Sequence, residues 1–440
     1  MNIIFAQIGA PTGKGHDGGT FTRAWLLDWL VKRGHKVSVL YLEPRNFDGS
    51  PYSEQQRRQD TKKLKELGVA EVRSVSIPLN PNFAQPAKNI FKRLSNSFSY
   101  RIAMRKNRVM ATRKICESVS DMTGDVCFAF GEVLFHFGGE VNKPVLSWFY
   151  HTGEPYNRLY IEYGMKTVLW SKTIASLVYP ITQYLYIRRK LKIAKYADYR
   201  VCPIHYYTER WKALSKGRLE VSSIPHPARD EGRNLSCLDP TRPPQKKPYR
   251  IVLFGHLRAI LTTVGLVHFV DHILPALDKR RRHDDFEFHI VGKFEPYPFV
   301  RQKLRRSNVY FEGFVDNLAE TLNSAHAVLV PIPILPGSGM RLSSACSASA
   351  CIITHDVTGI GFPELISNEN CLMASSGEEF VDALIRVCED LDLNKRLRVG
   401  ARMTYEENYR IERCGYSIEK LLIKAMDHPR NNRFFRQKLT

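Results

Sequence analysis

The chain has 440 residues, of which 43% are hydrophobic, enough for two or three domains with buried cores. Lysine and arginine number 65 against 44 acidic residues, and the net charge of +21 indicates a polyanionic partner: phosphorylated ligands, an anionic lipid surface or nucleic acid. The nine cysteines form neither a CxxC motif nor a cysteine–histidine cluster, so the sequence predicts no metal site and fits a reducing, cytosolic compartment. No RNA-binding motif is evident, so no nucleic-acid partner is expected.

The N-terminus predicts a βαβ unit. The run MNIIFAQIGAP lacks the basic start and longer apolar stretch of a signal peptide, and we expect a strand over Asn2–Ile8. The loop GAPTGKGHDGG follows, then a helix over Phe21–Arg33 with Thr20 as its cap, and a strand over Val37–Leu42. The helix N-terminus is a candidate anion site, although the loop has neither P-loop nor GxGxxG spacing. We expect no membrane-spanning helix, because no stretch of about 18 uncharged apolar residues is present.

Further strands of a parallel sheet are predicted by short apolar runs. Val126–Phe130 and Val145–Tyr150 read as buried strands, and Tyr199–Cys202 and Ser222–Ile224 as later ones. His151 stands at the carboxyl end of the Val145–Tyr150 run, where open α/β sheets place ligands. A capped loop histidine is the alternative interpretation.

Gly164–Ile187 combines bulky apolar residues, Trp170 and several tyrosines with flanking lysines and arginines, and Pro180 is expected to break it. This composition is typical of a segment that lies in a membrane interface. The alternative is a buried helical hairpin of the first domain.

A second α/β series follows a linker rich in proline and charge. We expect its first strand at Arg250–Phe254, a loop GHLRAILTTVG, and a helix over Leu266–Leu277. Later in the series, Pro336–Thr354 reads as a glycine turn, a helix of small residues and a strand, with Arg341 in the first turn of that helix. Glycines before a helix N-terminus that carries an arginine are an anion site. A simple tight turn is the alternative.

Two sets of motifs stand in a fixed order along the chain. The second half contains the segments FGHLRAILTTVGLVHFVDHILPAL, FHIVG, VYFEGFVDNLAETLNSAHAVLVPI, PGSGMR and THDVTGIGFPELI. The first half contains GGTFTRAWLLDWLVKRGHKVSVLYL, YHT at Tyr150–Thr152 and SIPHP at Ser223–Pro227. The ordered set resembles the GT-B glycosyltransferases, in particular glycosyltransferase family 4 (group 1): the second-half segments resemble successive blocks of its nucleotide-sugar domain, and the first-half segments resemble its N-terminal blocks. The resemblance implies an α/β chain of two Rossmann-like domains that face a cleft.

The domain boundaries expected on this basis are as follows. Residues 1–228 form an N-terminal Rossmann-like acceptor domain, with a membrane-interface segment near 164–189. Residues 229–249 are a linker, 250–405 the nucleotide-sugar-binding domain, and 406–440 a C-terminal helix and basic tail.

The family's chemistry implies roles for residues of this chain. Members transfer a sugar from a nucleotide-diphosphate donor with retention and usually without metal, and cations and backbone N–H groups stabilise the charge on the leaving diphosphate. The resemblance implies that His151 is catalytic near the transferred sugar, and that Gly18, Gly19 and Thr20 form an acceptor-side loop. The implied donor-binding residues are Gly255, His256, Arg258, Gly313, Phe314, Gly337, Ser338, Gly339, Arg341 and Ser343.

Two positions depart from the family pattern. The family usually has a lysine two residues after the arginine and a glutamate three further on, where this chain has Ser343 and Cys346. Two hypotheses therefore stay open. The first is a retaining hexosyltransferase in polysaccharide biosynthesis that uses a nucleotide-sugar donor and a lipid-linked or glycan acceptor. It would be cytoplasmic and peripheral on the inner face of a membrane, with no cofactor and no metal. The second is a catalytically degenerate subunit that binds nucleotide or a partner glycosyltransferase.

Overall fold

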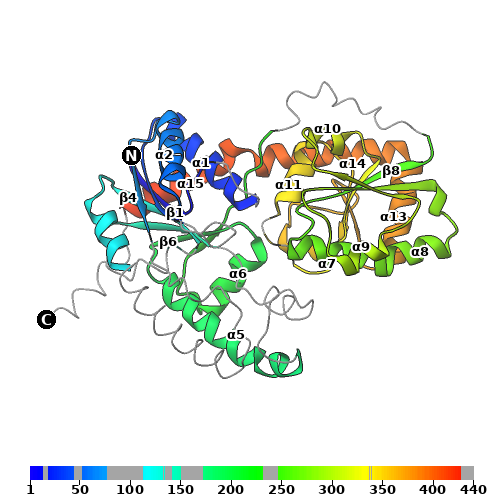
Figure 1. The fold of residues 1–440 in the computed structure, drawn as a ribbon, viewed down its shortest axis with the longest axis horizontal. Coiled ribbons are helices and arrows are strands. Elements are labelled where there is room, and N and C mark those ends of the chain that lie inside the picture. Colours follow the sequence, from blue (N-terminus) through cyan, green and yellow to red (C-terminus); the bar gives the residue numbers. More distant parts are fainter. Residues whose placement is uncertain are drawn as a thin grey trace.

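The computed structural model describes residues 1–12, 18–43, 52–76, 112–131, 133, 141–149, 172–230, 246–335, 337 and 339–427. For residues 18–20, 172–178 and 182 it describes the backbone alone. Figure 1 shows two domains side by side, with α1 and α6 of the first and α11 of the second on the facing sides.

The first domain is built on a seven-stranded parallel sheet in the order β3-β2-β1-β4-β5-β6-β7. The strands are β1 (Asn2–Ile8), β2 (Lys36–Leu42), β3 (Glu71–Val75), β4 (Val126–Phe130), β5 (Val145–Trp148), β6 (Tyr199–Cys202) and β7 (Val221–Ser223). The strands β4, β5 and β6 are buried along their whole length because both faces of the sheet are covered. Successive side chains enter opposite cores, so that Ile3 and Phe5 lie in one and Ile4 and Ala6 in the other.

Helices cover both faces of this sheet. They are α1 (Gly18–Lys32), α2 (Glu54–Glu66), the helix over residues 112–121, α5 (Lys172–Ala194) and α6 (His205–Leu214). The last helix of the described chain, α15 (Ile411–Asp427), also belongs here, because it packs against α1. His35 and Glu419 lie 2.8 Å apart in this contact, and the rings of Trp29 and Tyr416 lie 5.2 Å apart. The first domain is thus made from both ends of the described chain.

The second domain has a six-stranded parallel sheet in the order β10-β9-β8-β11-β12-β13. The strands are β8 (Tyr249–Phe254), β9 (Phe286–Val291), β10 (Val309–Gly313), β11 (Ala327–Val330), β12 (Ile352–His355) and β13 (Leu372–Ala374). The helices are α7 (Ile260–His268), η4 (Phe269–Ile273), α8 (Leu274–Lys279), η5 (His283–Asp285), α9 (Pro298–Lys303), α10 (Leu318–Asn323), α11 (Met340–Ser347), α12 (Val357–Gly361), α13 (Gly377–Glu389), α14 (Leu391–Thr404) and η6 (Tyr405–Tyr409).

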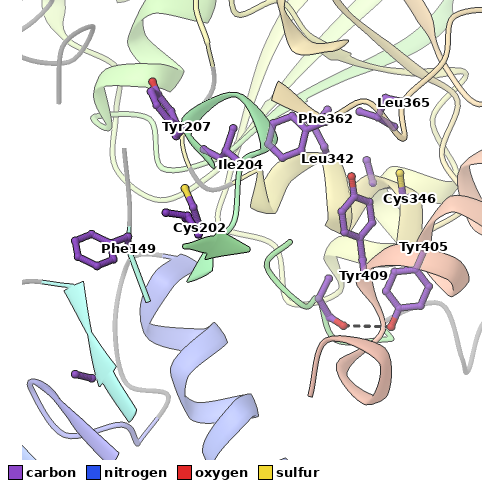
Figure 2. Close-up of a cluster of buried hydrophobic side chains, with 14 of the residues drawn as sticks. Phe149, Cys202, Ile204, Tyr207, Leu342, Cys346, Phe362, Leu365, Tyr405 and Tyr409 are labelled. Atoms are coloured by element: carbon purple, nitrogen blue, oxygen red, sulfur yellow. Dashed lines mark hydrogen bonds between the residues drawn. The ribbon is translucent and has the colours of Figure 1, made fainter. Parts of the chain in front are cut away.

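One apolar core runs from the first domain into the second. On the side of the first domain it includes Ile204 and Tyr207, at the start of α6. On the side of the second domain it includes Leu342 of α11, and Phe362 and Leu365 after α12 (Figure 2). A core shared in this way fixes the two facing edges relative to one another more firmly than polar contacts alone would.

The chain passes from the first domain to the second near residues 228–230 and returns near residues 402–405. Polar contacts link these two crossings. The Arg402 guanidinium donates to both carboxylate oxygens of Asp230, at 2.8 and 2.9 Å, and to the carbonyl of Ser347 at 2.8 Å. The Ser347 hydroxyl donates to the Arg229 carbonyl at 3.1 Å. The Tyr405 hydroxyl donates to the Ala228 carbonyl at 3.2 Å (Figure 2). The C-terminal end of α11 is therefore tied to both crossings.

Some expected elements differ from those observed. Helix α5 continues through Pro180, so the expected break there is wrong, because losing one backbone hydrogen bond weakens a long helix without ending it. Helix α7 begins at Ile260, inside the stretch expected to be a loop, with Ala259 as its N-cap. At the end of the second domain, α14 is followed directly by the π-helical turn η6.

One helical stretch, Ile260–Lys279, is long and apolar enough by length and composition to cross a membrane, although we expected none in the sequence. It is 67% buried inside the second domain, which is the environment of a core helix. No other helix of the described residues meets the same criteria.

Candidate functional site

The strand order of the second sheet places two glycine-rich loops side by side. The chain runs from β8 outward to β9 and β10, and then returns to the other side of β8 with β11. The loops that follow β8 and β11 therefore leave the sheet in opposite directions, which is where open α/β sheets bind ligands. Gly255 follows β8, and the loop after β11 leads through Gly337 and Gly339 into α11.

Arg341 lies directly over Gly255. An ideal Cβ built on Gly255 would stand 3.1 Å from Arg341 Nε and 3.4 Å from its Cδ. Gly255 also has φ of +144°, which favours glycine. The structure thus brings together two of the predicted donor-binding residues from loops 86 positions apart in the sequence.

Thr262, in the first turn of α7, completes this group. Its Oγ1 lies 3.1 Å from the same ideal Cβ position on Gly255. The side chain is 6% exposed, and the hydroxyl has no hydrogen-bond partner among the described residues. The neighbouring Thr263 hydroxyl donates instead to the Ala259 carbonyl at 3.1 Å. A buried hydroxyl without a partner beside an arginine is suited to an anionic oxygen.

The loops after β8, β9 and β10 are joined through their backbones. The Gly255 N–H donates to the Val291 carbonyl at 3.0 Å, and the Gly292 N–H donates to the Gly313 carbonyl at 2.7 Å. Gly292 has φ of +155°, and a Cβ there would overlap the carbonyl oxygen of Gly255. Only glycine fits at this crossing of two loops.

The N-terminus of α11 is shaped by Gly339 and Phe362. Gly339 is the N-cap residue, with φ of +70°, and it provides no side chain to cap the helix. A Cβ on Gly339 would overlap the ring of Phe362, which follows α12. Gly337 is buried beside it, and Ser338 lies outside the described residues. The uncapped first turn, with Arg341 in it, offers backbone N–H groups and positive charge to an anion.

Ser343 and Cys346 add no charge to this site. Ser343 is 1% exposed, and its hydroxyl donates to the Met340 carbonyl at 3.2 Å within the helix. Burial raises the pKa of the Cys346 thiol well above its usual range, which keeps it neutral. Within α11, residues 340–347, the charge is therefore carried by Arg341 alone.

The remaining donor-site candidates line the same edge of the sheet. The His256 ring lies 4.9 Å from that of Phe294, and Arg258 Nε donates to the Glu295 carbonyl at 3.2 Å. Gly313 has φ of +69°, and Phe314 after it is 74% exposed. All of these residues lie at or just after the carboxyl ends of β8, β9 and β10.

The first domain meets this edge through α1. Thr22 is buried, and its hydroxyl lies 3.5 Å from the sulfur of Met340, the first residue of α11. Gly18, Gly19 and Thr20 form the first turn of α1, so the N-terminal parts of α1 and α11 approach each other across the domain junction (Figure 1). His151 lies outside the described residues.

Sequence reasoning missed Thr262, Gly292 and Phe362 as parts of this site. The block FHIVG, in which a glycine follows a strand as Gly255 does, was a signal for Gly292. No comparable signal marks Thr262, because a threonine in the first turn of a helix is common and its missing partner appears only in three dimensions.

Two parallel sheets with helices on both faces, joined so that helix N-termini meet at the junction, define the GT-B class of fold. Three solved structures of this class match nearly the whole chain. A glycosyltransferase from Rickettsia africae ESF-5 is 12% identical with a TM-score of 0.61, over 97% of this chain and 98% of that one. Anabaena HepE in complex with UDP and glucose is 10% identical with a TM-score of 0.60, over 96% and 98%. WaaG, a glycosyltransferase involved in lipopolysaccharide biosynthesis, is 13% identical with a TM-score of 0.54, over 94% and 99%.

The second domain can also be placed by sequence. Residues 248–390 match the family model for glycosyl transferases group 1, which identifies this part of the chain as a glycosyltransferase group 1 domain. The expected resemblance and the expected GT-B fold are both confirmed. No curated protein matched the chain significantly.

Proposed function

We propose that the chain is a retaining glycosyltransferase that binds a nucleotide-diphosphate sugar on its second domain and transfers a hexose to a lipid-linked or glycan acceptor. The observation that carries the proposal is the position of Arg341 over Gly255, at the uncapped N-terminus of α11. The group 1 domain match and the UDP and glucose bound to HepE support it.

The proposed chemistry is charge stabilisation on the leaving diphosphate. As the bond from the sugar to the diphosphate breaks, negative charge grows on the departing oxygen. The Arg341 guanidinium, the backbone N–H groups of the first turn of α11 and the Thr262 hydroxyl are placed to meet that charge. This assignment uses cations and dipoles of the chain itself and calls for no metal and no cofactor.

The first domain is proposed to hold the acceptor and His151. The test incubates purified protein with UDP-, GDP- and ADP-sugars and a lipid-linked saccharide acceptor, and measures release of the nucleoside diphosphate. We expect turnover with one donor, and about a hundredfold lower turnover in His151→Ala with unchanged donor affinity, because the diphosphate contacts lie in the other domain. Wild-type activity in His151→Ala would remove this histidine from the mechanism.

Helix α5 supports location at a cytoplasmic membrane surface. Ile181, Tyr184 and Leu185 are 64%, 58% and 58% exposed, and their spacing places them on one face of the helix. The Arg188 guanidinium lies 5.5 Å from the Tyr184 ring centre, and Lys190 Nζ lies 5.3 Å from that of Tyr186. An exposed apolar stripe with a basic end fits the interface of an anionic bilayer.

The membrane proposal is tested by sedimentation with vesicles of phosphatidylglycerol and phosphatidylcholine. Replacing Ile181, Tyr184 and Leu185 with serine should release the protein, while its nucleotide binding stays unchanged. The matched control is the double variant Val399→Ser with Met403→Ser. These two apolar residues lie one turn apart on α14 of the second domain and are 54% and 56% exposed, so replacing them should not release the protein. Failure of the wild-type protein to sediment would overturn the proposal.

One observation favours a second candidate function, a degenerate subunit that binds nucleotide or a partner glycosyltransferase. At the two positions where the family usually has lysine and glutamate, this chain has a buried neutral hydroxyl and a buried neutral thiol. Nucleotide binding without turnover of any donor, either alone or with the acceptor, would favour this candidate over the enzyme.

A further inference from the structure

Two aromatic rings of α1 lie outside the cores of the described chain. Phe21 and Trp25 are one turn apart, and their ring centres are 6.0 Å apart with the planes inclined at 29°. Among the described residues, neither ring belongs to a buried core, whereas Trp29, one turn further on, packs against the core that α1 covers. Helix α15 also covers Trp29, because a Cβ on Gly415 would overlap its ring. Phe21, by contrast, is 39% exposed.

The position of the pair on the helix explains why it stays outside the core. Helix α1 buries Leu26, Leu27 and Leu30 completely. Since each residue advances about 100° round an α-helix, Phe21 and Trp25 lie together, about 100° or more from all three leucines. The stacked pair therefore extends beyond the buried side of α1.

The pair stands at the junction of the two domains. Thr22, next to Phe21, is buried, and its hydroxyl lies 3.5 Å from the sulfur of Met340, the first residue of α11. Arg341, at the proposed diphosphate site, directly follows Met340. Figure 1 shows α1 and α11 on the facing sides of the two domains. A molecule held by the aromatic pair would therefore lie beside the donor site.

The surroundings of the pair suit a sugar ring. The flat face of a sugar ring consists largely of C–H groups, which match the negatively polarised face of an aromatic ring. The rim of the sugar carries hydroxyls, and the first N–H groups of α1, from Gly18 onward, have no partner within the helix. An alkyl chain could contact the rings but would offer nothing to these N–H groups. A saccharide matches both features.

We propose that Phe21 and Trp25 are the platform on which a sugar ring of the acceptor stacks, so that the acceptor is a saccharide or carries one. This inference rests on the proposed function, because it places the acceptor opposite the donor site. It assigns two rings to which neither the sequence motifs nor the donor contacts gave a role. The part of the acceptor recognised at the junction is then the sugar and not a lipid.

The test measures binding by ligand-observed NMR, which requires no turnover. The probes are free disaccharides that end in glucose, galactose, mannose or N-acetylglucosamine, and decyl phosphate as an alkyl chain without a sugar. Phe21→Leu keeps apolar bulk but removes the aromatic face, and it should weaken binding of the best-bound disaccharide about fivefold, the scale of one aromatic contact. Phe21→Tyr should bind as the wild type does. Neither change should affect the binding of decyl phosphate.

Tyr416→Leu is the matched control. Tyr416 of α15 is 44% exposed, its ring lies 5.2 Å from that of Trp29, and the Arg33 guanidinium lies 4.8 Å from its ring centre. It is thus another exposed aromatic ring beside α1. Its partner Trp29 is about 12 Å further along the helix than Phe21, away from the junction. This variant should bind the disaccharide normally.

Binding of UDP, GDP and ADP to the same variants separates a binding role from a structural one. The diphosphate contacts lie in the other domain, so Phe21→Leu should bind the preferred nucleotide with wild-type affinity. Wild-type disaccharide affinity in Phe21→Leu, an equal loss for decyl phosphate or for the nucleotide, or no binding of any disaccharide to the wild type would overturn the platform. If the wild-type protein bound no nucleoside diphosphate, the proposed function itself would fall.

Discussion

At the scale of single residues, Arg341 is the side chain on which the candidate site depends most. It lies over Gly255 in the first turn of α11. We expect Arg341→Ala to weaken binding of the nucleoside diphosphate by about 1.5–3 kcal/mol, the contribution of a charge-assisted hydrogen bond. Calorimetry with the nucleotide measures the change directly.

Two variants control this prediction. Arg341→Lys keeps the charge but loses the planar guanidinium, so its affinity should lie between those of the wild type and Arg341→Ala. Arg280→Ala removes an exposed arginine that is paired with Asp382 at 2.9 Å, far along the chain from the loops of the site, and should bind normally. Equal affinity in Arg341→Ala and the wild type would show that this arginine does not contact the nucleotide.

The residues of the site were predictable from sequence to different degrees. Gly255, Gly339 and Arg341 stand in motifs whose order along the chain carries information, and the structure places them at one sheet edge. Phe21 carries no such signal, because an aromatic residue of an amphipathic helix is expected to face the core, and only the fold shows that this one does not. Cys346 was recognised as a departure from the family, but its burial became clear only in the fold.

At the scale of elements, the start of α11 depends on Gly339. A Cβ at this position meets both an unfavourable φ of +70° and the ring of Phe362. We expect Gly339→Ala to lower the free energy of unfolding by more than about 1 kcal/mol and to weaken nucleotide binding, because Phe362 and the helix N-terminus must move apart. Denaturant unfolding and calorimetry check the two effects.

Gly217→Ala separates the clash from the backbone conformation. Gly217 has φ of +72°, nearly the same as Gly339, but an ideal Cβ there has nothing within 4 Å. Its cost should therefore be that of the conformation alone, about 1 kcal/mol. If both variants were equally destabilised, the contact with Phe362 would contribute nothing.

Element prediction succeeded where one pattern dominated. Strands such as β1 and β4 are short apolar runs, buried on both faces, and the sequence located them closely. The interior of α5 was misjudged, because the effect of Pro180 depends on the rest of a 23-residue helix and not on proline alone. The start of α7 was missed because Ala259, its N-cap, forms no side-chain cap.

At the scale of the whole molecule, His226 makes the junction sensitive to acid. It lies where the chain leaves the first domain, 2% exposed, with its ring 5.1 Å from that of Trp148. Burial, followed by the positive charge of Arg23, lowers the pKa of His226 to about 3. Below about pH 6.5 the unfolded chain binds a proton that the folded chain does not.

Stability should therefore fall as the pH decreases from about 6.5 toward 3, with a contribution from His226 of about 1.4 kcal/mol per pH unit. In His226→Gln the unfolding free energy should depend less steeply on pH over this window, whatever its value at pH 7. Denaturant unfolding at several pH values gives the slopes. His283→Gln is the control, because it changes a half-exposed histidine and should leave the pH dependence of the unfolding free energy unaltered. If His226→Gln showed the same pH dependence as the wild type, His226 would not be the group responsible.

The two-domain organisation followed from sequence because each half begins as strand, glycine loop and helix. The return of α15 to the first domain did not, because an amphipathic helix shows that one face is buried but not against which partner. Residues such as Trp29 and Tyr416 find each other across almost the whole length of the chain.

This return of α15 sets an order for events on the ribosome. The second domain is contiguous from β8 to α14 and has its own core, so it can fold as soon as residue 404 has emerged. The first domain is synthesised earlier but waits for α15, which covers Trp29 so closely that a Cβ on Gly415 would overlap its ring. Until α15 is made, the side of α1 that carries Trp29 has no helix over it and is open to solvent and to chaperones. The domain that begins synthesis is thus the last to be completed.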